Sequence, residues 1–411
     1  MSRILWSLAA GVVTFAFAWP GLAAEPAVVH GQPSFVLENA SVQVAITKVG
    51  GHLVAAFDRA SPAPIQPYHV SPWQEEGSPN QPKIEPPILS VLRGDFFCMP
   101  FGGNNEAVDG QQHPPHGETA NGAWEFVSEL GGDGVTSLTL SLETKVRPGK
   151  VSKQLTLVDG HPVIYGTHVI EGFAGKTPLA HHATLAMPET EKMIRVSTSP
   201  FRFGLTKPSL FSDPAKREYQ ALAIGARFSD LHHVPQIFKD SPDADCTSFP
   251  ARRGFADLLC VVNEPSAKTG GPAWTAAVDN EKNFCWFALK DPAVLPITVF
   301  WIENHGRHAA PWSGRNNCLG LEDVCGMFAD GLAPSLRENE LSKEGVPTSI
   351  ELKSDQPTSI RYIQGAVRVP EEFDIVKSIE FSPGKAKLIS AAGPAVEVTV
   401  RHEYLQDGKV R

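Results

Sequence analysis

Histidines that lie close together in pairs are the first feature of this sequence that could do chemistry. Two pairs have the H-x-x-H spacing of many metal sites, and the other two are adjacent residues. The pairs are His113/His116, His181/His182, His232/His233 and His305/His308. Two prolines separate the first pair, so this segment is not helical and does not place both rings on one face. We predict no metal site, and a metalloenzyme that uses these pairs is kept as an alternative.

One glutamate has a context that suits acid-base chemistry. Glu322 lies in CLGLEDVCG, residues 318–326, an apolar segment with the composition of a strand. Burial of a carboxylate disfavours its charged form and raises its pKa, which makes it a useful general base. A salt bridge at a strand end is an equally simple explanation of the same residue. We take Glu322 as the candidate catalytic carboxylate.

A long irregular segment, residues 92–124, has the composition of a functional loop. It reads LRGDFFCMPFGGNNEAVDGQQHPPHGETANGAW and contains no apolar run that predicts a helix or strand. Connections of this length are usually functional or disordered. Its large apolar residues, Phe96, Phe97, Met99, Phe101 and Trp124, are too many for a disordered linker. We therefore predict an ordered loop that forms part of a site.

The elements that must position these residues are predicted to be strands. Residues 41–47 and 135–146 alternate apolar and polar side chains, and residues 151–172 have the pattern strand, Asp-Gly turn, strand. The 35 glycines and 35 prolines disfavour long helices, and we expect only short ones in 213–222 and 325–339. The predicted fold class is all-β: one large antiparallel β-sandwich with long loops, formed by residues 25–411 as a single domain.

The N-terminus has the features of an export signal. Residues 1–24 contain one basic residue, an apolar stretch and a small-residue end, which predicts a secretory signal peptide cleaved after Ala24. An uncleaved membrane anchor is the alternative. We expect a periplasmic or secreted protein with no membrane association after cleavage. The net charge of −9 and the lack of a basic stripe argue against a nucleic-acid partner.

Six cysteines in an exported chain permit disulfides. We expect Cys318 and Cys325 to flank a short loop and to be able to pair, and Cys246 and Cys260 are a second possible pair. The sequence does not establish either pairing. There is no C-x-x-C motif, so a zinc ribbon or a thioredoxin-type site is not supported.

The order of several short motifs resembles the aldose 1-epimerase (galactose mutarotase-like) superfamily, and within it the hexose-phosphate mutarotase branch. That branch has an Arg-Gly-Gly, a Pro-x-Phe-Gly, a His-Gly and a Trp in this order. The corresponding residues here are Arg93-Gly94, Pro100-Phe101-Gly102, His116-Gly117 and Trp124. LAHHATLAMPE (179–189) resembles the segment that holds the second catalytic histidine. CLGLEDVCG resembles the late Leu-Gly-x-Glu segment, and the resemblance spans residues 42–328.

The resemblance implies a β-supersandwich fold and a mutarotase that needs no cofactor. Glu322 would be the base and His182 the acid in opening and reclosing a cyclic hemiacetal. Substrate-binding residues would be Arg93, Asp95, His116, Trp124 and His181, and Trp301 or Trp312 could also stack on a sugar face. The additional aspartate of the family has two possible counterparts, Asp279 and Asp323.

Departures from the family pattern bear on the substrate. Asp95 replaces the second glycine of Arg-Gly-Gly, and no arginine follows His116-Gly117. Together with the export signal, this favours a free neutral or acidic sugar, or an oligosaccharide end, over a sugar phosphate. A non-catalytic carbohydrate-binding protein on the same fold is one alternative. A polysaccharide lyase is another, although the chain has only five tyrosines and none in residues 92–124.

Overall fold

The computed structural model describes residues 25–76 and 84–411, and the signal peptide predicted for residues 1–24 lies outside this part of the chain. Most of the regular structure is antiparallel strand, which confirms the all-β prediction. The helices are short: α1 (Pro87–Val91), α2 (Ser266–Thr269), α3 (Leu332–Leu336), α4 (Tyr404–Asp407), and 3₁₀ turns at Pro72–Gln74, Glu118–Ala120, Pro214–Lys216 and Ser342–Glu344. None of the described helices is long and apolar enough to cross a membrane.

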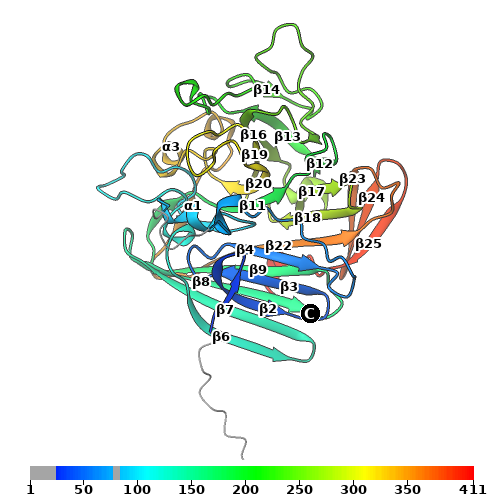
Figure 1. Cartoon of the computed structure of the whole chain (residues 1–411). Coiled ribbons are helices and arrows are strands. Elements are labelled where there is room, and N and C mark those ends of the chain that lie inside the picture. Colours follow the sequence, from blue (N-terminus) through cyan, green and yellow to red (C-terminus); the bar gives the residue numbers. More distant parts are fainter. Residues whose placement is uncertain (1–24, 77–83) are drawn as a thin grey trace, which may run out of the picture.

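Two large sheets form the body of the molecule (Figure 1). The seven-stranded sheet has the order β14 (Arg227–Phe228), β13 (Phe201–Thr206), β16 (Phe255–Asn263), β19 (Ile297–Asn304), β20 (Asn317–Cys325), β11 (Leu179–Ala186), β5 (Phe97–Cys98). The nine-stranded sheet has the order β15 (Ser248–Phe249), β12 (Ile194–Thr198), β17 (Ala273–Asp279), β18 (Phe284–Lys290), β22 (Thr358–Arg368), β9 (Val163–Glu171), β8 (Gly149–Val158), β7 (Val135–Thr144), β6 (Glu125–Gly132).

Smaller sheets complete the architecture. The N-terminal sheet contains β1 (Ala27–Val29), β2 (Gln32–Glu38), β3 (Val42–Thr47) and β4 (Leu53–Phe57). The C-terminal sheet contains β23 (Val376–Ser382), β24 (Lys385–Ser390) and β25 (Ala395–Thr399), and a two-stranded pair contains β10 (Gly175–Thr177) and β21 (Ile350–Leu352). Figure 1 shows β23–β25 in orange and red beside β17 and β18.

Apolar side chains fill both faces of the seven-stranded sheet. Leu319 and Leu321 of β20 point into the core between the two large sheets, with Phe300 of β19 and Trp286 of β18. The opposite, outer face carries a second cluster, which includes Trp301 of β19 and is covered by loops. A strand with both faces covered has a nearly continuous run of buried residues, and all nine residues of β20 are buried. The loops over the outer face form the site described below.

The cysteine predictions do not fit this structure. Cys318 and Cys325 lie at the two ends of one strand, β20, and not on either side of a loop. At about 3.3 Å per residue they are too far apart for a disulfide, which needs Cα atoms within about 7 Å. All six cysteines are buried free thiols, Cys246 and Cys260 included. The possible pairing of Cys318 with Cys325 does not form, because the segment between them is the extended strand that the context of Glu322 predicted and not a loop.

Candidate active site

The register of two adjacent strands brings the predicted catalytic residues together. β11 and β20 pair antiparallel, with His182 opposite Glu322 and His181 opposite Asp323. Side chains alternate between the two faces of a sheet. His182 and Glu322 therefore share the outer face, while His181 and Asp323 point into the core between the sheets. His181 and His182 are adjacent in the sequence, but their side chains lie on opposite faces of the sheet.

His182 and Glu322 are in direct contact. His182 Nε2 lies 3.2 Å from Glu322 Oε1, and His182 Nδ1 lies 3.2 Å from the Thr184 hydroxyl. Both side chains are buried, and Glu322 Oε2 has no hydrogen-bond partner among the described residues. Such an unpaired buried oxygen costs free energy unless a ligand or water pairs with it. One oxygen of Glu322 is therefore free to accept a hydrogen bond from a bound molecule.

Gly320 leaves room for this carboxylate. It precedes Glu322 by two residues in β20 and so lies on the same face. A Cβ atom at position 320 would lie 2.9 Å from Glu322 Oε1 and 2.9 Å from the Cβ of Trp301. Any side chain there would displace the glutamate or the tryptophan, which accounts for the glycine in the Leu-Gly-x-Glu segment.

The long loop of residues 92–124 places His116 beside His182. Their ring centroids are 5.1 Å apart, with the rings nearly perpendicular. His116 has a φ of 60°, and the following Gly117 has a φ of 77°. A Cβ at Gly117 would lie 1.9 Å from the Met99 carbonyl oxygen, so only glycine fits here. This turn holds the His116 ring at the site.

Phe96 forms the floor beneath His182. Its ring stacks on that of His182 at a centroid distance of 4.4 Å and on that of His52 at 3.9 Å. The backbone N–H of His182 also donates to the Phe96 carbonyl, at 3.0 Å. The Phe96 ring thus packs against both imidazole rings. His182 is therefore held by its backbone and by the face of its ring.

A cavity of about 290 Å³ opens above these residues. Its lining is mostly apolar and consists of Pro86, Ile88, Leu89, Leu92, Phe96, Pro115, His116, His182, Phe211, Leu258, Trp301, Arg307, Trp312, Glu322 and Ala329. A second cavity, of about 470 Å³, is larger but has no histidine among its described lining residues. Its buried carboxylate, Asp257, already accepts two backbone N–H groups. The cavity of about 290 Å³, which contains His116, His182 and Glu322, is therefore the better candidate for an active site.

Burial shifts the pKa values of the three titratable groups at the centre of this cavity. Desolvation raises the pKa of Glu322 to about 8, although the charge of Arg307 partly opposes the shift. Desolvation lowers the pKa of His182 well below its usual value, and the neighbouring His116 lowers it further. The pKa of His116 falls to about 4, again mainly through desolvation. Near neutral pH, therefore, the His182–Glu322 pair holds one proton and His116 is neutral.

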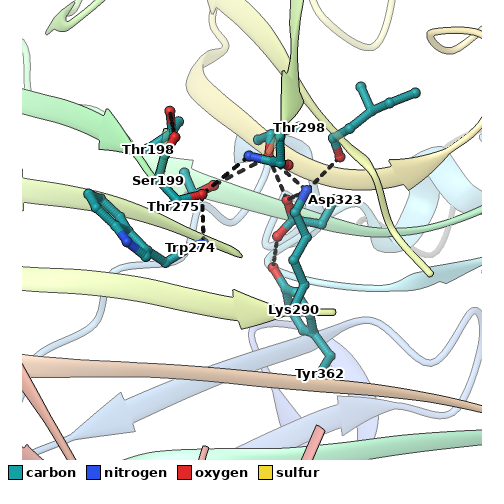
Figure 2. Close-up of polar contacts among 10 residues, drawn as sticks. Thr198, Ser199, Trp274, Thr275, Lys290, Thr298, Asp323 and Tyr362 are labelled. Atoms are coloured by element: carbon teal, nitrogen blue, oxygen red, sulfur yellow. Dashed lines mark hydrogen bonds and ion pairs between the residues drawn. The ribbon is translucent and has the colours of Figure 1, made fainter. Parts of the chain in front are cut away.

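The inner face of the same two strands carries a buried polar network (Figure 2). The Asp323 carboxylate accepts hydrogen bonds from Tyr362 and Thr298, both at 2.8 Å, and pairs with Lys290 at 2.6 Å. Lys290 also donates to the Ile297 carbonyl and to Thr298. Lys290 and Tyr362 belong to the nine-stranded sheet, so the network ties the two sheets together behind Glu322.

Four of the predicted substrate-binding residues lie outside the cavity lining. Arg93 is fully buried and donates to the carbonyls of Val29 and His30, both at 2.8 Å. Trp124 is also fully buried, and its Nε1 donates to the Thr119 carbonyl. These two residues anchor the long loop and the N-terminal strand.

Asp95 and His181, the other two, face the core between the sheets. The Asp95 carboxylate is 3.0 Å from His181 Nδ1 and accepts a hydrogen bond from Gln364. Their neighbours Phe96 and His182 line the cavity, because side chains alternate along extended chain. Of the two candidates for the family's additional aspartate, Asp323 belongs to the inner network and Asp279 accepts backbone N–H groups in a turn.

Arg307 is the main residue of the site that sequence reasoning missed. It lines the cavity from the loop after β19, and its Nε lies 3.4 Å from Glu303 Oε2. Its guanidinium lies over the rings of Phe211, Trp301 and Trp312, at 5.0 to 5.7 Å from the centroids. The tryptophans on either side were a usable signal, since arginine commonly packs on aromatic faces.

The histidine pairs do not come together into a metal site. Among residues 25–76 and 84–411, no group of three or more His, Cys, Asp or Glu side chains is arranged to hold a metal ion. The two members of the HPPH segment also differ in setting. His116 lines the cavity, whereas His113 is buried and both of its ring nitrogens lack a hydrogen-bond partner among the described residues.

Comparison with known proteins identifies the fold. No family model and no curated protein sequence matches the chain. A galactose mutarotase-like protein from Clostridium acetobutylicum superposes with a TM-score of 0.55 at 11% identity, covering 84% of this chain and 98% of the other. A candidate aldose 1-epimerase from Klebsiella pneumoniae gives 0.54 at 13% identity, covering 83% and 82%. A galactose mutarotase related enzyme from Lactobacillus acidophilus gives 0.51 at 11% identity, covering 82% and 99%.

These similarities define the class of protein by its architecture. The chain has the β-supersandwich fold of aldose 1-epimerase and galactose mutarotase-like proteins, as the resemblance of its motifs implied. At such low identity the likeness establishes the fold alone, and function must be argued from the residues of the site.

Proposed function

We propose that this protein is an exported aldose 1-epimerase-like mutarotase, which interconverts the anomers of a free sugar. The observation that carries the proposal is the contact between His182 Nε2 and Glu322 Oε1 in a cavity where Glu322 Oε2 has no partner among the described residues. This arrangement supplies a proton acceptor and a proton donor at one place, as hemiacetal opening requires.

The reaction balances with one proton on the pair. One member takes the proton from the anomeric hydroxyl while the other donates a proton to the ring oxygen. The bond between C1 and the ring oxygen breaks, C1 becomes a carbonyl carbon, rotation about C1–C2 follows, and the reverse steps close the ring. The pair ends with one proton, as it began, so no cofactor or net charge change is needed.

The pKa shifts favour one of the two positions of the shared proton. They place the shared proton on Glu322 at neutral pH, whereas the resemblance implies Glu322 as base and His182 as acid. Transfer of that proton across the 3.2 Å contact converts one arrangement into the other. His116, neutral and beside His182, is placed to hydrogen-bond a sugar hydroxyl.

The other functions considered have less support from the site. A lyase was expected to use tyrosine, and no tyrosine lines this cavity among the described residues. A non-catalytic sugar-binding protein would not need a buried His–Glu pair with shifted pKa values. Export is proposed from the composition of residues 1–24 alone.

Exchange between anomers, measured by proton NMR on a panel of free sugars, tests the proposal. Wild-type protein is expected to accelerate exchange for at least one sugar, and Glu322→Gln to abolish the acceleration. If no sugar on the panel exchanges faster than the buffer control, the protein is not a mutarotase for that panel. Sugar-induced thermal stabilisation without exchange would favour the binding protein.

A further inference from the structure

A single fixed cation in an otherwise apolar wall distinguishes this cavity. Apart from His116, His182 and Glu322, Arg307 is the one ionisable residue among the described lining residues, and the rest are aliphatic, aromatic or proline. A hexose and the corresponding hexuronate share their ring hydroxyls and differ only at C6, where a carboxylate, unlike a hydroxymethyl group, can pair with a guanidinium through two hydrogen bonds. The wall therefore favours a ligand with a charged group that Arg307 can bind.

The guanidinium of Arg307 is held in place but is not saturated. Its Nε lies 3.4 Å from Glu303, and three aromatic rings surround its plane. Neither Nη1 nor Nη2 donates a hydrogen bond to another residue in the described part of the chain. The side chain is 27% exposed and lines the cavity. Two parallel N–H donors match the two oxygens of a carboxylate.

Glu303 does not occupy this pair of donors. Its Oε1 accepts the backbone N–H groups of Gly306 and Arg307. Desolvation raises the pKa of Glu303 to about 7, so its negative charge near neutral pH is incomplete. The Arg307 side chain consequently keeps positive charge to offer to a ligand.

Arg307 is also close to the reacting groups. All three residues line the same cavity, Glu322 from β20, the neighbour of β19, and His116 from the long loop, and the charge of Arg307 lowers the pKa of both. A volume of about 290 Å³ is at the lower end of ordinary ligand sites and suits one sugar ring. An anionic group on that ring can therefore reach Arg307 while the anomeric carbon is at the His182–Glu322 pair.

We propose that the site is specific for a sugar monocarboxylate, a hexuronate, whose carboxylate pairs with Nη1 and Nη2 of Arg307. This inference rests on the proposed mutarotase function and names its substrate class. A phosphate dianion fits less well, because no second cation among the described lining residues would share its charge. Phe211, Trp301 and Trp312 would then serve to hold the guanidinium plane in the binding orientation.

Matched sugars that differ only at C6 test the inference. We expect wild-type kcat/KM for anomer exchange to be about 10- to 100-fold higher with galacturonate or glucuronate than with galactose or glucose. Arg307→Gln should reduce this ratio to near one, and Arg307→Lys, which keeps the charge but not the paired donors, should give an intermediate ratio. Arg368→Gln removes an exposed arginine outside the cavity and should leave the ratio unchanged. Far-UV circular dichroism checks that the variants fold.

Two results would overturn the inference. One is equal kcat/KM for hexuronate and hexose in the wild type. The other is an equal loss for both sugars in Arg307→Gln and Arg307→Lys, which would make Arg307 a positioning residue for Glu322. If the anomers of no sugar are exchanged, the proposed mutarotase function fails. Calorimetric titration with galacturonate then tests the carboxylate site by itself. Binding that Arg307→Gln abolishes keeps the carboxylate site, and binding that is absent or independent of Arg307 refutes it.

Discussion

His182 and Glu322 face each other across β11 and β20, and the next pair along the same strands, His181 and Asp323, faces the opposite way. The first pair lines the cavity. The second belongs to the hydrogen-bonded interior between the sheets. One register therefore fixes both the pair that lines the cavity and the network behind it, and a slip of β11 by one residue would place His181, and not His182, opposite Glu322.

The rate of anomer exchange should depend on the proton shared by His182 and Glu322. We expect kcat/KM to be nearly constant around neutral pH and to fall as pH rises above about 8, where Glu322 loses the proton. On the acid side it should fall only well below pH 6.5, because burial lowers the pKa of His182. Polarimetry from pH 5 to pH 9.5, corrected for buffer catalysis, measures this profile. A rate that still rises through pH 9 would contradict the one-proton pair.

Glu322 should lower stability at alkaline pH. Its pKa is near 4.5 when unfolded and about 8 when folded, so the folded state binds the proton more tightly. The stabilisation that proton binding by Glu322 gives to the folded state is complete below pH 4.5 and is lost as pH rises to 8. The change in unfolding free energy is on the order of 1.4 kcal/mol for each unit by which the pKa is raised. Relative to wild type, Glu322→Gln should therefore become more stable from pH 5 to pH 8.

Urea unfolding at pH 5, 7 and 9 measures this difference. Glu397→Gln is a matched control, because Glu397 is an exposed residue paired with Lys385. The control should follow the wild-type pH dependence. Equal pH dependence of wild type and Glu322→Gln would show that the carboxyl titrates normally in the folded protein.

Arg93 should affect stability and not sugar binding. Arg93→Met leaves the carbonyls of Val29 and His30 without their buried donor, which should cost about 3 kcal/mol of unfolding free energy. The KM for the best sugar should stay within about twofold of wild type, because Arg93 does not line the cavity. Chemical unfolding and steady-state kinetics on the same preparation check both. A large rise in KM with normal stability would restore Arg93 to the binding site.

The buried pair of Lys290 and Asp323 should show strong energetic coupling. Removing one partner, as in Lys290→Met or Asp323→Leu, leaves a buried charge uncompensated and should cost about 3–5 kcal/mol. The double variant should cost much less than the sum of the two. The exposed pair Lys385–Glu397 is the control, with an expected coupling of about 0–1 kcal/mol. Additive losses of unfolding free energy in the Lys290 and Asp323 variants would show that the two residues are not energetically coupled.

The sequence could predict those parts of the fold that have a local pattern of apolar and polar residues. Alternation identified β3 and β7, and the apolar context of Glu322 correctly predicted a strand, β20. The order of motifs assigned His182 and Glu322 to the catalytic positions, and the structure brings these two residues into contact. The predicted helical regions proved much shorter, with only Pro214–Lys216 in residues 213–222 and α3 in residues 325–339.

Contacts between distant segments account for what the sequence could not predict. The two backbone carbonyls that accept from Arg93 lie more than 60 residues away, at Val29, the last residue of β1, and at His30 after it, so this structural role has no local signal. The sequence placed Asp95 and His181 in the substrate-binding site together with their neighbours. Which face of the sheet their side chains occupy depends on the register with other strands, which the sequence does not give. Arg307 depends on aromatic residues from separate segments, including Phe211. Its place in the cavity therefore becomes evident only in three dimensions.

The most direct test of the account is the anomer exchange rate of wild type, Glu322→Gln and His182→Ala, measured by two-dimensional proton exchange NMR with galacturonate. His402→Ala, which changes a histidine far along the sequence and outside the cavity lining, is the control. We predict acceleration by wild type and by His402→Ala, and a loss of at least about 100-fold in both site variants. Acceleration that survives in Glu322→Gln and His182→Ala would contradict the His182–Glu322 pair as the catalytic centre.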